Sequence, residues 1–313
     1  MISVPVVAAS ERRHVVDVEG WSRGEIERML DRAEEMRAAR ASRLYRSLLE
    51  AETVGLAFFE TSTRTRISFE LAAKALGATV VDLQASSSSL SKGESLVDTL
   101  RTLERTGVTI LVMRHASSGA PDLAVRSTGL RIVNGGDGTH AHPTQALLDA
   151  LTLRERFGAL DGRLIAIVGD VAHSRVARSN IHALQALGAR VRVAGPEPWI
   201  AGFESWPGVE TATTLADGIR DADAVMTLRV QLERDAAASI GSLDAYVDAW
   251  RLDEARMARW AAPDAPVLHP GPTNEGVELT ADLANGPRSL IGRQVENGVP
   301  TRMAILATVA GAV

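Results

Sequence analysis

Two patterns of apolar residues alternate along the chain. Short apolar runs predict buried strands, and segments whose apolar positions recur with helical spacing predict amphipathic helices. The strands are expected at 54–59, 79–83, 108–113, 131–134, 164–168, 190–194, 224–228 and 266–268, and the helices at 26–36, 68–76, 96–106, 121–127, 143–157, 175–187, 215–220 and 293–309. Continuous strand–helix alternation is typical of parallel sheets with helices on both faces. The pattern therefore predicts an α/β fold with two doubly wound parallel-sheet domains.

The composition excludes several classes of protein. A chain of 313 residues with a net charge of −5 suits two domains and argues against a nucleic-acid surface. No apolar run reaches the length of about 18 residues that a membrane span needs. The absence of cysteine excludes disulfides, thiol nucleophiles and Cys-ligated metals. Residues 1–10 lack the basic start of a signal peptide, so we expect a cytoplasmic protein with no membrane or nucleic-acid partner.

The most informative stretch lies between the first strand and the following helix. Ser62, Thr63, Arg64, Thr65 and Arg66 place three hydroxyls and two guanidiniums there, with no acidic residue among them. A helix N-terminus favours anions through its dipole and free amides, and Arg matches phosphate oxygens in pairs. A solvated polar turn is the alternative interpretation. The strand-to-helix context favours a phosphate site.

Other polar clusters follow later strands, and ligands in such folds collect at the carboxyl ends of strands. Arg114 ends an apolar strand, and Arg229 with Gln231 ends another. His142 and Gln145 are three residues apart at a helix start, so both can face one point. The remaining candidates are Arg175 at a helix start, which is weaker evidence, and the 269–272 segment His-Pro-Gly-Pro.

One lysine is notable in a chain that strongly prefers arginine. Only Lys74 and Lys92 occur among 34 basic residues. Lys92 lies in the Ser- and Gly-rich segment 86–95, which is either a solvated connector or a flap that closes over a ligand. No P-loop, G-x-G-x-x-G or histidine ligand spacing occurs, so we expect no nucleotide cofactor and no metal.

These motifs resemble a known family. F-F-E-T-S-T-R-T-R, S-S-L-S-K-G-E-S, M-R-H, H-P-T-Q-A-L-L-D, R-V-Q and H-P-G-P, in this order, are similar to the catalytic chains of aspartate carbamoyltransferases, within the aspartate/ornithine carbamoyltransferase superfamily. The similarity runs from about Glu25 to the C-terminus. It implies transfer of the carbamoyl group of carbamoyl phosphate to the amine of L-aspartate in de novo pyrimidine biosynthesis. The expected domains are 1–145, which binds carbamoyl phosphate and is completed by a C-terminal helix within 292–313 packing back on it, and 146–291, which binds aspartate.

The resemblance also implies roles for individual residues. The phosphate of carbamoyl phosphate is expected to contact Ser62, Thr63, Arg64 and Thr65. Its carbonyl oxygen is expected to contact Thr65, Arg114 and His142, and its amide Gln145 and the carbonyls of Pro270 and Gly271. Gly271 and Pro272 are counted among the carbamoyl-phosphate contacts. The catalytic residues among them are Arg64, Thr65, Arg114 and His142. Aspartate is expected to contact Arg175, Arg229, Gln231, Pro270 and Lys92.

Lys92 and Ser89 would reach in from a neighbouring subunit, so the resemblance implies a homotrimer with shared active sites. The Ser-rich segment is a residue shorter than in some relatives, which leaves Ser88 and Ser89 open as the phosphate contact. Glu275 stands where many relatives have Arg, which leaves the energetics of closure open. Regulatory chains or other pyrimidine-pathway enzymes as partners are also left open.

Two alternatives to this function remain. A carbamoyltransferase for another amine such as ornithine would keep the phosphate half and change the acceptor half. Arg175, Arg229 and Lys92 suit a dicarboxylate better than a cationic acceptor. A non-catalytic pathway scaffold is the second alternative, although the chain retains all the expected charged contacts.

Overall fold

The structure, a computed structural model, describes residues 13–39, 44–84, 94–230 and 242–312. The chain divides into two compact units. The first unit comprises residues 1–18, 27–148 and 296–313, and the second comprises 19–26 and 149–295. Within the described ranges, no helix combines the length and apolar character that a membrane crossing requires.

The first unit is built on a four-stranded parallel sheet in the order β2-β1-β3-β4. The strands are β1 (Thr53–Phe58), β2 (Thr79–Gln84), β3 (Ile110–His115) and β4 (Arg131–Asp137). Five of the six residues of β1 are buried, as expected for a parallel strand covered on both faces. The helices of this unit are α2 (Thr63–Ala75), α3 (Leu96–Arg105) and α4 (Ala120–Ser127), with most of α1 (Arg23–Ala39).

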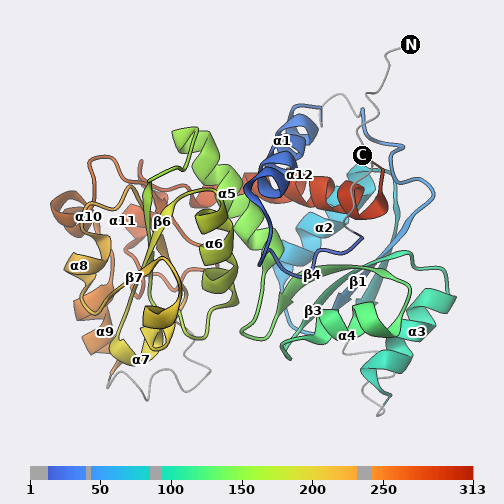
Figure 1. Cartoon of the computed structure of the whole chain (residues 1–313), viewed down its shortest axis with the longest axis horizontal. Coiled ribbons are helices and arrows are strands. Elements are labelled where there is room, and N and C mark those ends of the chain that lie inside the picture. The colour runs from blue at the N-terminus through green and yellow to red at the C-terminus, as the bar shows by residue number, and fades with distance from the viewer. Residues whose placement is uncertain (1–12, 40–43, 85–93, 231–241, 313) are drawn as a thin grey trace. The chain divides into compact units, whose positions relative to one another are not determined.

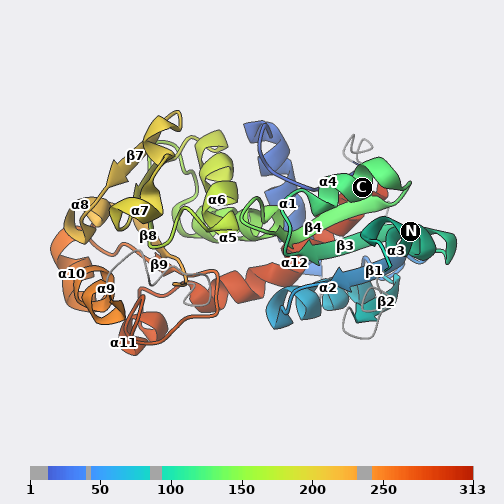
Figure 2. The same ribbon diagram turned by 90° about the horizontal axis from the view of Figure 1, so that it is seen from below.

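Helices cover both faces of this sheet. Leu111 and Met113 of β3 join a core cluster with Leu100 of α3 and Ala124 of α4. In Figure 2, α2 lies on the opposite side of the sheet from α4. Because side chains alternate along a strand, the intervening residues of β3 face the other way. This two-faced burial produces the near-continuous apolar runs that predicted the strands.

The C-terminal helix α12 (Ile291–Ala310) packs on the first unit, as predicted. Its Thr308 accepts a hydrogen bond from Arg32 Nη1 of α1 at 2.8 Å. Its Arg302 guanidinium lies 5.1 Å from the centre of the Phe69 ring of α2. The prediction of a returning C-terminal helix is therefore confirmed.

The second unit holds a five-stranded parallel sheet in the order β7-β6-β5-β8-β9 (Figure 1). The strands are β5 (Leu164–Val168), β6 (Arg190–Ala194), β7 (Val209–Ala212), β8 (Ala224–Thr227) and β9 (Val267–Leu268). The helices wholly in this unit are α6 (Arg175–Ala186), α7 (Glu197–Ile200), α8 (Leu215–Ile219), α9 (Leu243–Trp250), α10 (Glu254–Trp260) and α11 (Ala281–Asn285). The predicted architecture of two parallel-sheet domains is confirmed.

The sequence pattern missed short elements of the second unit. Strand β7 and helices α7, α9, α10 and α11 were not predicted. Strand β7 is a half-exposed edge strand of four residues, too short and too polar to show an apolar run. Helices α7 and α11 have four and five residues, which is shorter than the window in which helical spacing shows.

Candidate functional site

The hydroxyl and guanidinium cluster at 62–66 forms the first turn of α2. The predicted helix began at Ser68, whereas α2 begins at Thr63, with Ser62 as an extended N-cap at φ −159° and ψ 94°. Thr65 and Phe69, one turn apart, are both buried, so an apolar face already anchors this turn. The first amides of a helix have no partner within the helix. The cluster therefore presents backbone N–H groups together with its side chains where β1 ends.

The members of this cluster differ in exposure. Thr63 and Arg64 are exposed, Ser62 is half-buried and Thr65 is buried. The Ser62 side chain makes no capping hydrogen bond to the helix, so its hydroxyl is not committed to that role. Three hydroxyls, an arginine and a helix N-terminus thus lie within one turn, a combination that favours anion binding.

Arg66 differs from its neighbours in the cluster. No acidic residue lies between Ser62 and Arg66, but Arg66 Nη1 donates to Asp82 Oδ2 of β2 at 2.8 Å. The structure thereby gives Arg66 a counter-charge from a neighbouring strand. Arg66 links α2 to the neighbouring edge strand.

Arg114 lies inside β3 rather than beyond its end. The predicted strand at 108–113 is shifted by two residues, because β4 continues alongside and pairs Asp137 with His115. Arg114 Nη1 donates to the Gly135 carbonyl at 3.3 Å, and its Nε lies 3.3 Å from Glu60 Oε2. The Arg114 side chain is 16% exposed, so these contacts fix the orientation of a largely buried guanidinium.

The glycine-rich stretch 135–138 is mostly strand, although its composition is typical of a turn. Strand β4 runs through Asp137, with a register shift opposite Met113 and His115. Gly138 has φ 45°, and a Cβ there would lie 2.3 Å from Ser118 Oγ. Gly138 therefore lets the chain that follows β4 approach the segment that follows β3.

A buried carboxylate holds the segment between β4 and α5 (Pro143–Phe157). Asp137 is fully buried and accepts hydrogen bonds from Gly119 N at 2.7 Å, Asn134 Nδ2 at 2.7 Å and Ala141 N at 3.2 Å. The Asn134 side chain also accepts from Gly136 N at 2.7 Å. Asp137 thus joins the end of β4, the start of α4 and the approach to His142. We name this set, with His140, the Asp137 anchor.

His140 adds a titratable group to this anchor. Its Nδ1 lies 3.0 Å from Asp137 Oδ2, and its Nε2 lies 3.4 Å from Asp17 Oδ2. Partial burial works to lower the pKa of His140, but the charges of Asp137 and Asp17 and the hydrogen bond to Asp137 outweigh it. The net result is a pKa raised above the ordinary value of histidine.

His142 and Gln145 lie at the start of α5, as predicted. Helix α5 begins at Pro143, a position where proline fits because its missing N–H is not needed. His142 and Gln145 are 4% and 7% exposed, and Gln145 N donates to the His142 carbonyl at 3.0 Å. Both side chains are therefore held in a buried helix start rather than on a solvated face.

In the second unit, two predicted arginines follow adjacent strands. Strands β5 and β8 pair in parallel, and the chain order changes direction between them. Ligands of such sheets bind at the carboxyl ends of strands at this switch point. Half-buried Arg175 opens α6, where Ala177 N donates to the N-cap Ser174 at 3.1 Å. Half-buried Arg229 comes two residues after the end of β8.

The His-Pro-Gly-Pro segment follows β9. His269 is 1% exposed, its N–H donates to Gln294 Oε1 at 3.0 Å, and its Nδ1 accepts from Gly271 N at 2.8 Å. Gly271 has φ 67°, and the Gly271–Pro272 peptide is cis. Pro270 and Gly271 are half-buried, whereas Pro272 is exposed. The segment is thus held as a tight loop by its own histidine.

Several buried acids that hold the site segments in place were not predicted from the sequence. Asp149 is fully buried and accepts from Gln294 Nε2 at 2.7 Å and Asn180 Nδ2 at 2.9 Å, which extends the support beneath His269. An acid on the apolar face of the 143–157 helix is a signal that could have identified it. Asp137 and Glu278 gave no comparable signal, because neither lies on the apolar face of a predicted helix.

Three predicted site residues lie outside the described residues: Ser89, Lys92 and Gln231. The same holds for Ser88. The structure places the other predicted residues in two groups, each within its own unit. Ser62, Thr63, Arg64, Thr65, Arg114, His142 and Gln145 belong to the first unit, and Arg175, Arg229, Pro270, Gly271 and Pro272 belong to the second.

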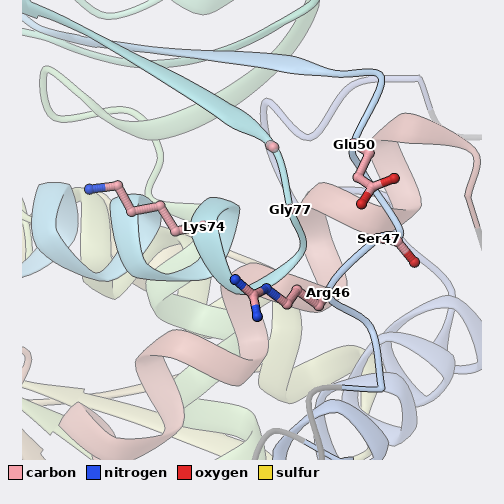
Figure 3. A pocket seen from close by; sticks show the side chains of 6 residues that line it. Arg46, Ser47, Glu50, Lys74 and Gly77 are labelled. Carbon is pink, nitrogen blue, oxygen red and sulfur yellow. The ribbon is translucent and has the colours of Figure 1, made fainter.

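A pocket of about 390 Å³ lies elsewhere in the first unit (Figure 3). Arg46, Ser47, Glu50, Lys74 and Gly77 line it. Lys74 lies at the far end of α2 from Arg64, about 15 Å away at 1.5 Å per helical residue. Its ammonium group pairs with Glu70 at 2.7 Å. This pocket is therefore separate from the first turn of α2.

Two family models match the chain. Residues 13–155 match the carbamoyl-phosphate-binding domain of aspartate/ornithine carbamoyltransferases, and residues 161–309 match their aspartate/ornithine-binding domain. An aspartate carbamoyltransferase catalytic subunit of Myxococcus xanthus is 51% identical over 295 residues, covering 94% of this chain and 98% of the relative. One from Thermus aquaticus is 50% identical, covering 94% and 97%.

Solved structures agree in fold. An aspartate transcarbamoylase of Trypanosoma cruzi, in complex with carbamoyl aspartate and phosphate, has a TM-score of 0.85 and 32% identity, covering 98% of this chain and 99% of that one. An ornithine carbamoyltransferase of Pyrococcus furiosus has a TM-score of 0.86 and 28% identity, covering 98% and 100%. Because both acceptor classes fit equally well, the fold alone does not select the acceptor.

Proposed function

This chain belongs to the aspartate/ornithine carbamoyltransferase family, and we propose that it works as an aspartate carbamoyltransferase through the two groups of residues described above. It transfers the carbamoyl group of carbamoyl phosphate to L-aspartate, which gives N-carbamoyl-L-aspartate and phosphate for de novo pyrimidine biosynthesis. The observation that carries the proposed site is the placement of Ser62, Thr63 and Thr65 around the first turn of α2.

The first turn of α2 would bind the phosphate group. Its amides and the hydroxyls of Ser62 and Thr63 supply neutral donors, and exposed Arg64 supplies the positive charge. Charge-assisted hydrogen bonds to a dianion are about twice as strong as neutral ones. Arg64 would therefore contribute most when phosphate leaves with its full charge.

Arg114, His142 and Thr65 would polarise the carbonyl of carbamoyl phosphate. All three are largely buried, where a donor acts through a lower dielectric than in water. Gln145 and the carbonyls of Pro270 and Gly271 would accept the hydrogen bonds of the amide nitrogen. Gly271 and Pro272 are then carbamoyl-phosphate contacts, and Pro270 also borders aspartate.

Arg175 and Arg229 would bind the two carboxylates of aspartate. Both are half-buried at the carboxyl ends of parallel strands, where the bidentate geometry of Arg matches a carboxylate. Lys92 and Gln231 complete the aspartate contacts in this proposal. An acceptor with a cationic side chain would find arginines where it needs carboxylates.

The chemistry needs orientation and electrostatic stabilisation. The neutral amine of aspartate attacks the carbamoyl carbon, the carbonyl oxygen takes up negative charge, and the tetrahedral intermediate expels phosphate. The amine proton passes to the departing phosphate, since none of the proposed contacts is an evident general base. Orientation of two bound substrates can lower the barrier by about 7–11 kcal/mol. Donors aimed at the oxyanion lower it further.

A homotrimer in the cytoplasm completes the proposal, with Ser89 and Lys92 supplied by a neighbouring subunit. An exposed apolar patch on the first unit supports contact with a second copy. Ile67 and Leu71 lie one turn apart on α2 at 42% and 45% exposure, and Val81 lies on edge strand β2 at 40%. Large exposed apolar side chains beside a sheet edge mark an interaction surface.

The patch offers a test of assembly. Leu71→Glu should dissociate the trimer in sedimentation and abolish turnover, because a lone subunit would lack Lys92. Glu35→Gln, an exposed change on the same unit, is the control. A monomer that turns over normally would remove the shared site from the proposal.

The reaction itself is tested by phosphate release from carbamoyl phosphate with aspartate or ornithine in parallel. Turnover with aspartate alone supports the proposal. Turnover with ornithine alone would retain the phosphate site and overturn the roles of Arg175, Arg229 and Lys92. No turnover with either acceptor would contradict the enzyme assignment and favour a scaffold.

A further inference from the structure

Glu278 is a buried carboxylate that ties two loops of the second unit together. It is 1% exposed. Its Oε1 accepts hydrogen bonds from Val230 N at 2.8 Å and Asn274 Nδ2 at 2.8 Å, and its Oε2 accepts from Asn274 N at 2.8 Å. One side chain thus joins the segment after β8 to the segment after His-Pro-Gly-Pro.

Val230, the residue after Arg229, is held on three sides. Its side chain is fully buried in the core cluster with Tyr246 and Leu279. Its N–H donates to Glu278, and its carbonyl accepts from Asn274 Nδ2 at 3.2 Å. The Val230 peptide N–H belongs to the planar unit that also contains the Arg229 carbonyl. Fixing this peptide therefore fixes the backbone from which the Arg229 side chain extends.

Burying a carboxylate at this position costs free energy unless its oxygens accept hydrogen bonds. Burial raises the pKa of the Glu278 carboxyl, while the N–H donors of Val230 and Asn274 act in the opposite direction. A buried carboxylate is tolerated in proteins when donors satisfy its oxygens. Three N–H donors, Val230 N, Asn274 N and Asn274 Nδ2, point at Glu278 from the two loops. They satisfy the carboxylate oxygens in place of water.

We propose that Glu278 is a positioning residue, which sets the affinity for aspartate by holding the Val230 peptide and thereby the direction of Arg229. The inference rests on the proposed function, in which Arg229 binds a carboxylate of aspartate. Glu278 touches neither substrate in this account. Its effect reaches aspartate only through the backbone of the segment after β8.

The matched variant is Glu278→Gln, which keeps the shape and replaces one oxygen with an amide NH₂. An N–H donor then faces the N–H of Val230 or of Asn274, so at least one hydrogen bond is lost whichever way the amide turns. We expect the KM for aspartate to rise about 10-fold or more. The KM for carbamoyl phosphate and kcat at saturating aspartate should stay within about 2-fold, since the proposed phosphate and carbonyl contacts lie in the first unit and are untouched.

A second readout isolates carboxylate binding from chemistry. Succinate has two carboxylates and no amine, so it should compete with aspartate without reacting. Its inhibition constant should rise by the same factor as the KM for aspartate in Glu278→Gln. Asn274→Ala removes the side-chain donor to both Val230 and Glu278 and leaves the Asn274 N–H bond, so a smaller rise in the same two constants is expected.

Controls separate positioning from folding and from the function itself. Glu204→Gln removes an exposed acid of the same unit and should change neither constant. Equal loss of kcat and of both substrate affinities in Glu278→Gln, or an unchanged KM for aspartate in both variants, overturns the positioning role. If Glu278→Gln fails to fold, Asn274→Ala decides alone. Wild-type protein without aspartate-dependent phosphate release would instead refute the proposed function.

Discussion

The two units hold their proposed substrate contacts with the same device but different surroundings. In the first unit, buried Asp137 accepts backbone N–H bonds from Gly119 and Ala141 and fixes the approach to His142. In the second unit, buried Glu278 accepts backbone N–H bonds from Val230 and Asn274 beside Arg229. In both cases a carboxylate that touches no substrate in our proposal orders a loop, because buried N–H groups must find an acceptor.

The difference lies in the third partner. Asp137 also faces His140, a side chain that changes charge near neutral pH, whereas the hydrogen bonds to Glu278 described above come from amides alone. The comparison teaches that similar loop anchors can respond differently to pH. We expect the carbamoyl-phosphate half to depend on the charge of an imidazole and the aspartate half to depend on hydrogen-bond geometry.

The largest expected effect is a loss of kcat on removal of Arg64, a proposed substrate contact rather than a loop anchor. Arg64→Ala removes the main cation facing the leaving phosphate and should lower kcat about 10²-fold or more, by analogy with the loss of an oxyanion donor. Steady-state phosphate release at saturating substrates measures it. Arg101→Ala removes an exposed cation of the same unit as a control. Full activity of Arg64→Ala would refute the phosphate assignment.

A loss of binding in the second unit is the next largest effect. Arg229→Ala should raise the KM for aspartate several tens-fold, because it deletes a charge-assisted contact to a carboxylate. The KM for carbamoyl phosphate should change little. Arg220→Ala, which breaks an exposed pair with Asp217, is the matched control. Equal changes in both KM values would argue against the division of labour between the units.

The Asp137 anchor should respond more moderately. Asp137→Asn keeps the volume but replaces one acceptor with a donor, which leaves a buried N–H group unsatisfied at a cost of about 1–3 kcal/mol. We expect lower stability in urea unfolding and a rise of about 10-fold in the KM for carbamoyl phosphate. A rise confined to the KM for aspartate would show that the anchor does not serve His142.

The smallest expected effect is a pH-dependent change in stability, which tests whether the imidazole of His140 distinguishes the Asp137 anchor from Glu278. The folded pKa of His140 is raised, so its protonation stabilises the fold fully below the unfolded pKa of about 6.5. This contribution is lost as pH rises through the folded pKa. The stability advantage of wild type over His140→Gln should therefore shrink between acidic and mildly alkaline pH in thermal unfolding. A pH-independent difference would mean that the imidazole acts through packing alone.

Local sequence patterns predicted most elements because they depend on residues close in the chain. The strand at 164–168 and the helix at 143–157 have the predicted bounds, since an apolar run and a proline-led amphipathic segment are local features. The start of α2 was missed by five residues, because Thr65 and Phe69 form a buried face, and Phe69 lies against Arg302 from a distant part of the chain. The end of β4 was missed for the same reason, since its pairing with β3 extends the strand.

The candidate site also divides into residues that local sequence predicts and contacts that only the folded chain shows. The sequence by itself determined the family, the two-domain α/β fold and the polar clusters at strand ends, because these follow from motif order and periodicity. Only the tertiary structure showed that Arg66 pairs with Asp82, that Asp137 supports the approach to His142, and that Glu278 holds the peptide after Arg229. A hydrogen bond between residues 48 positions apart leaves no periodic trace in a sequence, since its partners meet only when the chain has folded.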